Sequence, residues 1–199
     1  LSGMKTILLF LYVFLSATLF GQNVYIPDAN FKTYLVVNFD INTNEDNEIQ
    51  VSEASAFDGL INCIDLGISD LTGVEAFTAL TGLQCSYNQL TSLDVSQNTA
   101  LTLLECSGNQ LTSLDVSQNT VLGVLHCSLN QLTGLDVSTN TELYELEFES
   151  TQVQSIDLSQ NTELWWLACE NSPLVSLDIS NSNSLEFLYA GGNQLNCLN

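Results

Sequence analysis

The chain has 199 residues, of which 23 are Asp or Glu and only two are Lys or Arg, so its formal net charge is −21. Such an acidic surface repels the phosphates of nucleic acids and of anionic lipids, which argues against both as partners and favours cations or cationic surfaces. The mean hydropathy is nevertheless positive at +0.19, so the charges must surround a strongly apolar core.

The first 21 residues have the pattern of a secretory signal peptide. Residues 1–3 precede Met4 and are interpreted as an upstream scar, Lys5 supplies the basic start, and residues 7–20 are apolar, with cleavage expected after Gly21. The apolar run is short for a membrane span, although a membrane anchor stays as the alternative. After cleavage we expect a secreted or surface-displayed chain without membrane insertion, whose 23 acidic residues and one lysine give a net charge of −22.

Residues 22–60 lack repeats and are predicted to form a small helical cap at the N-terminal end of the fold. Residues 29–37 should form a helix that begins next to Asp28, because Phe31, Tyr34, Leu35 and Phe39 recur at helical spacing. A second short helix is predicted over residues 51–57. The two helices should cover apolar strand ends that the first repeat would otherwise expose.

The segment between these helices is similar to an EF-hand calcium loop, whose ligands alternate along the chain because every second side chain points inward. Side chains of Asn42, Asn44, Asp46, Gln50 and Glu53 occupy ligand positions 1, 3, 5, 9 and 12, and the carbonyl of Glu48 occupies position 7. Position 1 is Asn42 where Asp is usual, and position 6 is Asn47 where Gly is usual, which should weaken binding. The loop is therefore either a weak calcium site or a degenerate loop that only caps the fold.

Residues 61–199 repeat with a period of 21, as six leucines show: Leu83, Leu104, Leu125, Leu146, Leu167 and Leu188. Each unit contains two related phrases of 10 and 11 residues, and about six and a half units are present. A fixed period of this length predicts a β-rich solenoid with parallel strands and few helices. Alternation at Leu114 and Val116 further predicts a second short strand in each unit, and hence parallel β-structure on both faces.

Two kinds of residue recur at fixed places in the repeat. Asn88 and Asn98 begin two columns that are interpreted as structural turn residues. Cysteines two residues after the repeat leucine form a third column, in which Phe148 and Ala190 also occur, so this position is a core position. We expect reduced, buried thiols there and no disulfides or zinc. The cysteines of this column are Cys63, Cys85, Cys106, Cys127 and Cys169.

The pattern of Leu80, Leu83, Cys85, Asn88 and Leu90 resembles bacterial leucine-rich repeats of the nested 10 and 11 class. Together with the signal peptide, it makes the chain similar to secreted, internalin-like surface proteins. Such proteins often carry a C-terminal cap or sorting domain. The sequence shows neither and stops in mid-unit, so a truncated reading frame is expected.

Outward positions beside the repeat leucine should lie on the concave face of the array. One column reads Gly82, Leu103, Val124, Glu145, Trp166, Phe187; the next reads Gln84, Glu105, His126, Glu147, Ala168, Tyr189; and the third reads Ser86, Ser107, Ser128, Glu149, Glu170, Gly191. Trp166, Phe187 and Tyr189 should therefore adjoin, with Tyr144 and Trp165 at the edge. The candidate ligand-binding residues are Tyr144, Glu145, Glu147, Glu149, Trp165, Trp166, Glu170, Phe187 and Tyr189.

An exposed aromatic patch beside carboxylates predicts a binding or adhesion module that recognises a protein on the concave face. A carbohydrate-binding surface protein and a structural spacer without its own site are the alternatives, and Trp165 and Phe187 would pack under a missing C-terminal cap in the spacer. We predict no enzyme, because His126 is the only histidine and points away from Cys127. The acidic column that begins at Asp94 is interpreted as solvated. The sequence leaves the ligand and the oligomeric state open.

Overall fold

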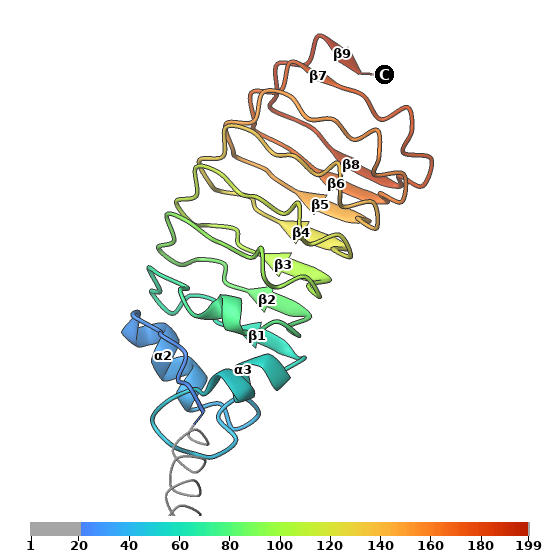
Figure 1. Cartoon of the computed structure of the whole chain (residues 1–199). Helices are drawn as coiled ribbons and strands as arrows, with labels where there is room; N and C mark the ends of the chain where they lie inside the picture. The colour runs from blue at the N-terminus through green and yellow to red at the C-terminus, as the bar shows by residue number, and fades with distance from the viewer. Residues whose placement is uncertain (1–20, 199) are drawn as a thin grey trace, which may run out of the picture.

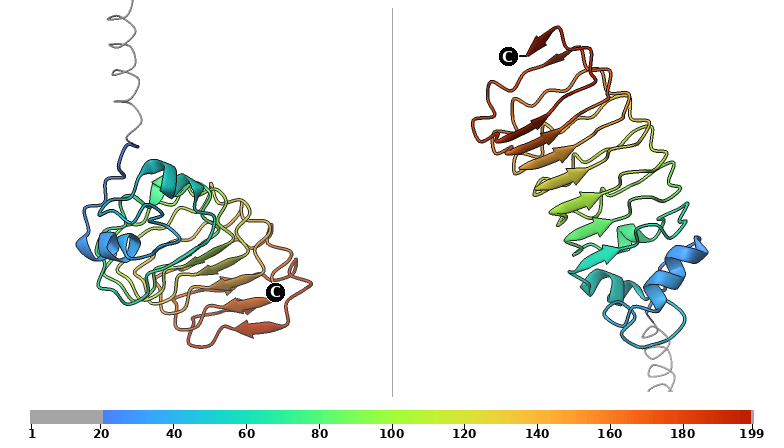
Figure 2. Two further views of the ribbon diagram at one scale, coloured as in Figure 1. Left: turned by 90° about the horizontal axis from the view of Figure 1, so that it is seen from below. Right: turned by 180° about the vertical axis from the view of Figure 1, so that it is seen from behind.

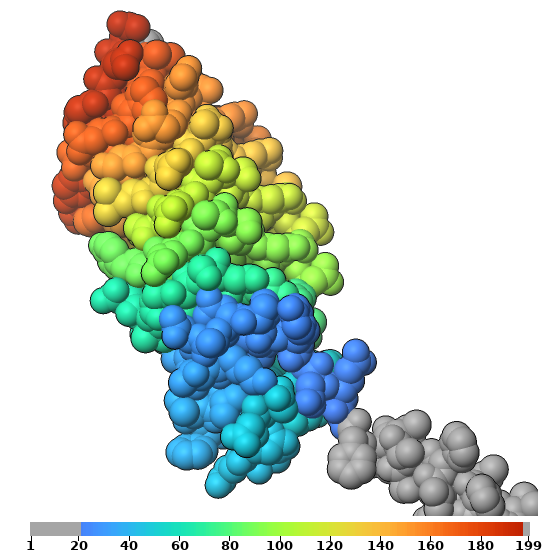
Figure 3. All heavy atoms as spheres, turned by 90° about the vertical axis from the view of Figure 1, so that its left-hand side faces the viewer, coloured from blue at the N-terminus to red at the C-terminus, as the bar shows by residue number. Residues whose placement is uncertain are grey.

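The computed structural model describes residues 21–198, which form a helical cap followed by a stack of coils along one axis (Figure 1). The coils follow one another in chain order from the cap to the C-terminal end (Figure 3). Residues 1–20 of the predicted signal-peptide segment, which extends to Gly21, lie outside the described residues. Within the described part of the chain, no helix has the length and hydropathy needed to cross a membrane.

The cap contains the two predicted helices, α2 (Ala29–Val36) and α3 (Val51–Ala56). Helix α2 begins at Asp28 because the Asp28 carboxylate accepts the free N–H groups of Asn30 and Phe31 at 2.9 and 3.0 Å. The helix ends at Val36, and the expected helical position of Phe39 is wrong: this side chain is 71% exposed. The next chain segment instead turns back, where Asn42 Nδ2 donates to the Val36 carbonyl at 2.8 Å.

The cap and the array share one hydrophobic core. Phe31 and Leu35 from α2 are fully buried, as are Ile41 and Ile49 from the loop between the helices, and they belong to the same cluster as the repeat leucines. A short 3-10 helix, η1 (Val74–Ala76), lies in the first coil against α3. Burial of these residues closes the end of the solenoid, as predicted for a cap.

Seven strands of three residues form one parallel sheet along the side of the stack (Figures 1 and 2). Each strand is one period further along the chain, with Leu83 opposite Leu104 and Leu104 opposite Leu125. The parallel solenoid predicted from the repeat is thereby confirmed. The strands are β1 (Leu60–Asn62), β2 (Gly82–Gln84), β3 (Leu103–Glu105), β4 (Val124–His126), β5 (Glu145–Glu147), β6 (Trp166–Ala168) and β8 (Phe187–Tyr189).

The predicted second strand in every unit is wrong for most of the array. In the described residues, only β7 (Ser176–Leu177) and β9 (Cys197–Leu198) pair on that side. An Asp that follows the second-phrase leucine in each unit limits the length of any strand there, as Asp115 does where its carboxylate accepts the Ser117 N–H at 2.9 Å and the backbone turns. Even β7 ends after two residues, directly before Asp178, which accepts the Ser180 N–H in the same way.

The cysteine column lies inside the coils, as predicted, and the asparagine columns, which were predicted as turn residues, are also buried. Asn119 is fully buried, and its Nδ2 donates to the carbonyls of Val95 and Asn98 in the preceding coil at 3.1 and 2.9 Å. The five cysteines of the column are free and buried, and burial raises the pKa of the Cys106 thiol to about 12. These thiols therefore act as small apolar core groups.

Candidate functional site

The outward face of the seven-stranded sheet carries the aromatic side chains that the sequence placed together. The strand register sets Phe187 beside Trp166, and the ring centroids of these two residues are 5.2 Å apart. Tyr189, two residues further along β8, also lies beside Trp166, at 5.0 Å between centroids. Because β6 and β8 are three-residue strands with an inward central leucine, buried in β6 and half-buried in β8, their first and third side chains must both point outward. We call Trp166, Phe187 and Tyr189 the aromatic cluster.

Two further candidate aromatics lie just before the strands. The ring of Trp165 stands edge-on to Phe187, with centroids 5.5 Å apart and an interplanar angle of 80°. Tyr144 does not join the aromatic cluster: its ring covers Gly123 in the preceding coil, where an added Cβ would lie 2.6 Å from Tyr144 Cε1. Tyr144 is therefore separate from the other predicted site residues, although it is 43% exposed.

Carboxylates line the side of the aromatic cluster that faces the middle of the array. Glu147 is tied to the cluster directly, because Trp166 Nε1 donates to Glu147 Oε1 at 3.0 Å. Glu149 and Glu170 are half-buried in the next column. Burial raises the pKa of Glu149 above its ordinary value, and the charges of Glu147 and Glu170 add to this effect. The face therefore combines exposed rings with carboxylates that repel one another.

His126 lies at the centre of this face, and the sequence reasoning gave it no role. Its Nε2 is 2.9 Å from Glu145 Oε1, and its Nδ1 is 3.9 Å from Glu105 Oε1 and 4.0 Å from Glu147 Oε2. The signal was present in the sequence, because Glu105, His126 and Glu147 are consecutive members of one outward column. Glu145 reaches the histidine from the neighbouring column.

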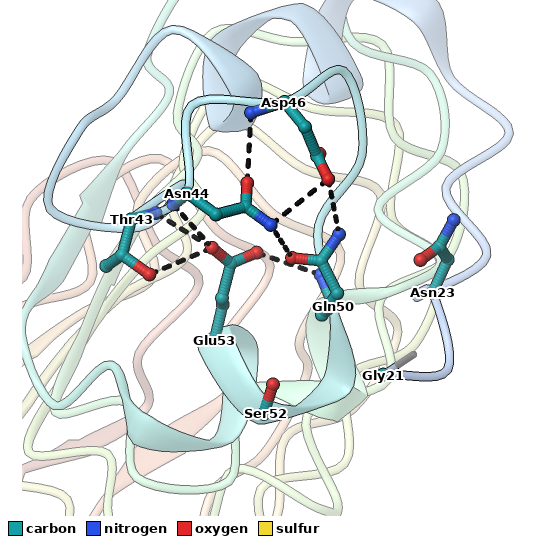
Figure 4. A pocket seen from close by; sticks show the side chains of 8 residues that line it. All are labelled: Gly21, Asn23, Thr43, Asn44, Asp46, Gln50, Ser52 and Glu53. Atoms are coloured by element: carbon teal, nitrogen blue, oxygen red, sulfur yellow. Dashed lines mark hydrogen bonds between the residues drawn. The ribbon is translucent and has the colours of Figure 1, made fainter. Parts of the chain in front are cut away.

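The cap loop brings four of the six predicted calcium ligands around one open pocket (Figure 4). These four are Asn44, Asp46, Gln50 and Glu53. Asp46 Oδ2 accepts amide N–H groups from Asn44 and Gln50 at 3.1 and 3.0 Å. Glu53 accepts backbone N–H groups from Thr43 and Asn44 with one oxygen and from Gln50 with the other.

The other two predicted ligands do not line that pocket. The side chain of Glu48 pairs with Lys32 at 2.8 Å, which leaves only its carbonyl for the predicted role. Asn42 is buried, with its Nδ2 bonded to the carbonyls of Val36 and Asp46. Its Oδ1 accepts no hydrogen bond within the described part of the chain.

Comparison with known proteins finds similarity to leucine-rich-repeat proteins. No protein-family model matches it. Internalin J of Listeria monocytogenes is 38% identical over 77 residues, which are 38% of this chain and 8% of internalin J. The structure of internalin C2 from L. monocytogenes aligns with a TM-score of 0.63 at 19% identity, covering 87% of this chain and 90% of internalin C2.

A leucine-rich-repeat protein of Leptospira interrogans aligns with a TM-score of 0.60 at 26% identity, covering 62% of this chain and 34% of the Leptospira protein. The chain thus spans only a small part of internalin J and about a third of the Leptospira protein. The alignment with internalin C2 extends over most of both chains and establishes the shared fold. The chain therefore has a leucine-rich-repeat fold, and its array is similar to those of the Listeria internalins.

Proposed function

We propose that the chain is an adhesion module of a secreted or surface-displayed protein and that it binds a protein through the outward face of its sheet. The observation that carries this proposal is the aromatic cluster on β6 and β8. Phe187 and Tyr189 remain 40% and 42% exposed although they contact Trp166. Exposed aromatic groups on an otherwise polar surface are typical of the energetic centre of a protein interface.

The charge of the chain indicates the chemistry of the partner. Once the signal peptide is removed, the chain has 23 acidic residues and a single basic residue, Lys32. Four of the acidic residues lie beside the aromatic cluster: Glu145, Glu147, Glu149 and Glu170. A partner that presents Lys or Arg around an apolar contact would relieve the repulsion among these carboxylates. The proposed partner is therefore a basic protein surface.

The ring geometry favours a protein over a sugar. Trp166 is inclined to Phe187 and Tyr189 by 42° and 44°, and the indole N–H is already bonded to Glu147. Tilted rings form an uneven apolar patch that suits side chains, whereas a sugar ring stacks best on one flat, accessible face. A carbohydrate ligand is the second outcome that the experiment must distinguish.

The test is to measure binding of the purified chain to an array of basic and acidic proteins and to an array of polysaccharides, at low and high salt. The matched variants are Trp166→Ala/Tyr189→Ala on the sheet face and Tyr25→Ala/Phe39→Ala in the cap, where both aromatics are also exposed. We expect binding to basic proteins that weakens with salt and is lost only in the sheet-face variant. Binding to polysaccharides alone, or equal binding by both variants, would overturn the proposal.

We further propose that the cap loop binds calcium weakly. Asn44, Asp46, Gln50 and Glu53 supply oxygens around one pocket, and the buried Oδ1 of Asn42 has no donor among the described residues. A hard cation satisfies such oxygen groups. Asn44 and Gln50 would need to turn their amide oxygens inward, since each now directs its amide nitrogen toward Asp46.

Calorimetry with CaCl₂ tests this second proposal. Asn44→Asp adds a carboxylate at a ligand position that lines the pocket and should tighten binding, whereas Asp46→Asn should weaken it. Asp70→Asn, outside the loop, is the control. If no variant takes up calcium, or if Asp46→Asn binds as well as the unchanged chain, the loop serves only as part of the cap.

A further inference from the structure

The group around His126 has the donor atoms of a transition-metal site. One ligand atom from each of His126, Glu145 and Glu147 can be chosen so that all three lie within 4.8 Å of one another. The tightest approach is 2.9 Å, between His126 Nε2 and Glu145 Oε1. Donors bound to Zn²⁺ at about 2 Å in a tetrahedral site lie roughly 3.3 Å apart. Small side-chain rotations would therefore bring these three groups onto one ion.

The backbone fixes where these side chains begin. His126 lies on β4 and the two glutamates on β5, and the parallel register sets His126 directly beside Glu147. Glu145 is two residues before Glu147 and therefore points to the same face. The side chains are only about a quarter exposed or less, at 21% for His126 and 25% for each glutamate, so they have limited freedom to turn away.

Neighbouring groups support the same arrangement. Trp166 Nε1 holds one oxygen of Glu147 at 3.0 Å, which leaves Oε2 directed toward the histidine at 4.0 Å. Glu105 adds a third carboxylate at 3.9 Å from Nδ1. Within the described residues, the array offers no lysine or arginine to neutralise these three carboxylates. A neighbouring side chain that hydrogen-bonds to a metal ligand and orients it, as Trp166 does to Glu147, commonly raises metal affinity by about 10- to 100-fold.

We propose that His126, Glu145 and Glu147 bind a divalent transition metal of the zinc class on the outward face of the sheet, with Glu105 beside the ion. One imidazole nitrogen and two carboxylates are suitable zinc ligands, and water would complete the coordination. The imidazole distinguishes this site from the oxygen-only cap loop, which suits a harder ion. The site goes beyond the proposed adhesion function and does not depend on it.

The experiment uses the full chain without a polyhistidine tag, treated with chelator and titrated with ZnCl₂ in excess CaCl₂, which occupies oxygen-only sites. Calorimetry measures the stoichiometry. Labelling with ¹⁵N-histidine gives a single imidazole system, because His126 is the only histidine. We expect one zinc ion per chain, a shift of the His126 ring nitrogen resonances, and a change in the fluorescence of Trp166 through its bond to Glu147.

Matched variants separate this site from other zinc binding. His126→Gln and Glu147→Gln should each weaken binding by about tenfold or more, whereas Glu163→Gln, an exposed acid in the next coil, should bind zinc as the unchanged chain does. Circular dichroism measures whether each variant is folded. If His126→Gln does not fold, the isosteric Glu147→Gln still tests the proposal. Zinc uptake that leaves the imidazole resonances unshifted, or that survives both variants, would overturn the proposal. Because no protein ligand is present, that result would leave the adhesion proposal unaffected.

Discussion

At the scale of single residues, the buried asparagines connect one coil to the next. In the column of Asn98, Asn119, Asn140 and Asn161, each side chain donates its two amide hydrogens to backbone carbonyls of the preceding coil, as Asn140 does to Val116 and Asn119 at 3.0 and 2.9 Å. Each of these carbonyls also accepts one backbone N–H within its own turn, as Val116 accepts the Asn119 N–H at 3.0 Å, but most have no ladder partner in the next coil. A hydrogen bond of this kind contributes about 0.5–1.5 kcal/mol net. The asparagine column therefore replaces the missing second sheet.

Replacing Asn119 by Ala tests this role. Both donated hydrogen bonds disappear, while the carbonyls of Val95 and Asn98 each keep one backbone donor, so we expect the free energy of unfolding to fall by about 1–3 kcal/mol. Urea unfolding followed by circular dichroism measures the change. Gln118→Ala, at the adjacent exposed position, is the control and should change little; equal effects of both substitutions would contradict the assignment.

The aspartates on the same side of the coils stabilise the turns through their charged form. Hydrogen bonds from the Ser117 hydroxyl and N–H lower the pKa of Asp115 below its ordinary value of 3.8. A carboxyl whose pKa is lower in the folded state contributes stability above its unfolded pKa, and that contribution is lost as the pH falls through the folded pKa. The same shift occurs at Asp94, Asp136, Asp157 and Asp178.

We therefore expect the chain to lose stability as the pH falls below about 3.8. Asp115→Asn keeps a side-chain oxygen that can accept the Ser117 N–H but removes the titration. Urea unfolding across the acid range should thus show a smaller loss of stability in this variant than in the unchanged chain. An identical acid profile for the two proteins would mean that Asp115 does not contribute through its charge.

At the scale of elements, each coil has one sharp turn after its strand, where the backbone adopts a left-handed conformation. Two of these positions are Gly108 and Gly192, and the others carry side chains at a positive φ of 54° to 57°. Residues other than Gly, Asn and Asp pay about 1–2 kcal/mol there. The substituted turn positions are Asp65, Tyr87, Leu129, Ser150 and Asn171.

Ser150→Asn should stabilise the chain by about 0.5–1 kcal/mol, because Asn tolerates the left-handed conformation better than Ser. Asn171 occupies the equivalent position one coil later, so the larger side chain has a precedent in the array. Thermal unfolding measures the effect. Ser155→Asn, at an exposed site whose φ is not positive, should be neutral, and an equal gain there would remove the conformational explanation.

At the scale of the whole molecule, stability depends on stacking and on net charge. Three-residue strands and short turns cannot hold a coil alone, so each coil relies on its neighbours and the first relies on the cap. Lys32 is the only Lys or Arg among the described residues, and it pairs with Glu48. The other acidic residues of the described chain have no such Lys or Arg partner. Self-repulsion of this kind opposes the compact state.

We expect NaCl to raise the midpoint of thermal unfolding, because it screens the repulsion among exposed carboxylates, and most of the rise should occur below about 0.15 M. Choline chloride at equal ionic strength distinguishes screening from binding of a particular cation and should act similarly. A midpoint that does not change with either salt would show that the acids are too well separated to repel.

The repeat period, the core leucines and cysteines, the two cap helices and the gathering of Trp166, Phe187 and Tyr189 could all be derived from the sequence. They follow from periodicity: an in-register stack of identical coils converts a spacing of 21 residues into neighbourhood in space. The prediction of a second strand in every unit was wrong for most of the array because alternation at Leu114 and Val116 did not reveal that the turn at Asp115 leaves few residues for pairing on that side. Within the described residues only β7 and β9 pair there.

Only the tertiary structure decided how side chains in neighbouring columns orient toward one another. It turned Tyr144 over Gly123 and away from the aromatic cluster, and it brought Glu145 from one column to His126 in another. The sequence determines the column of each residue because the backbone register is periodic. The rotamers depend on local packing and charge, which differ from coil to coil because the outward residues do not repeat.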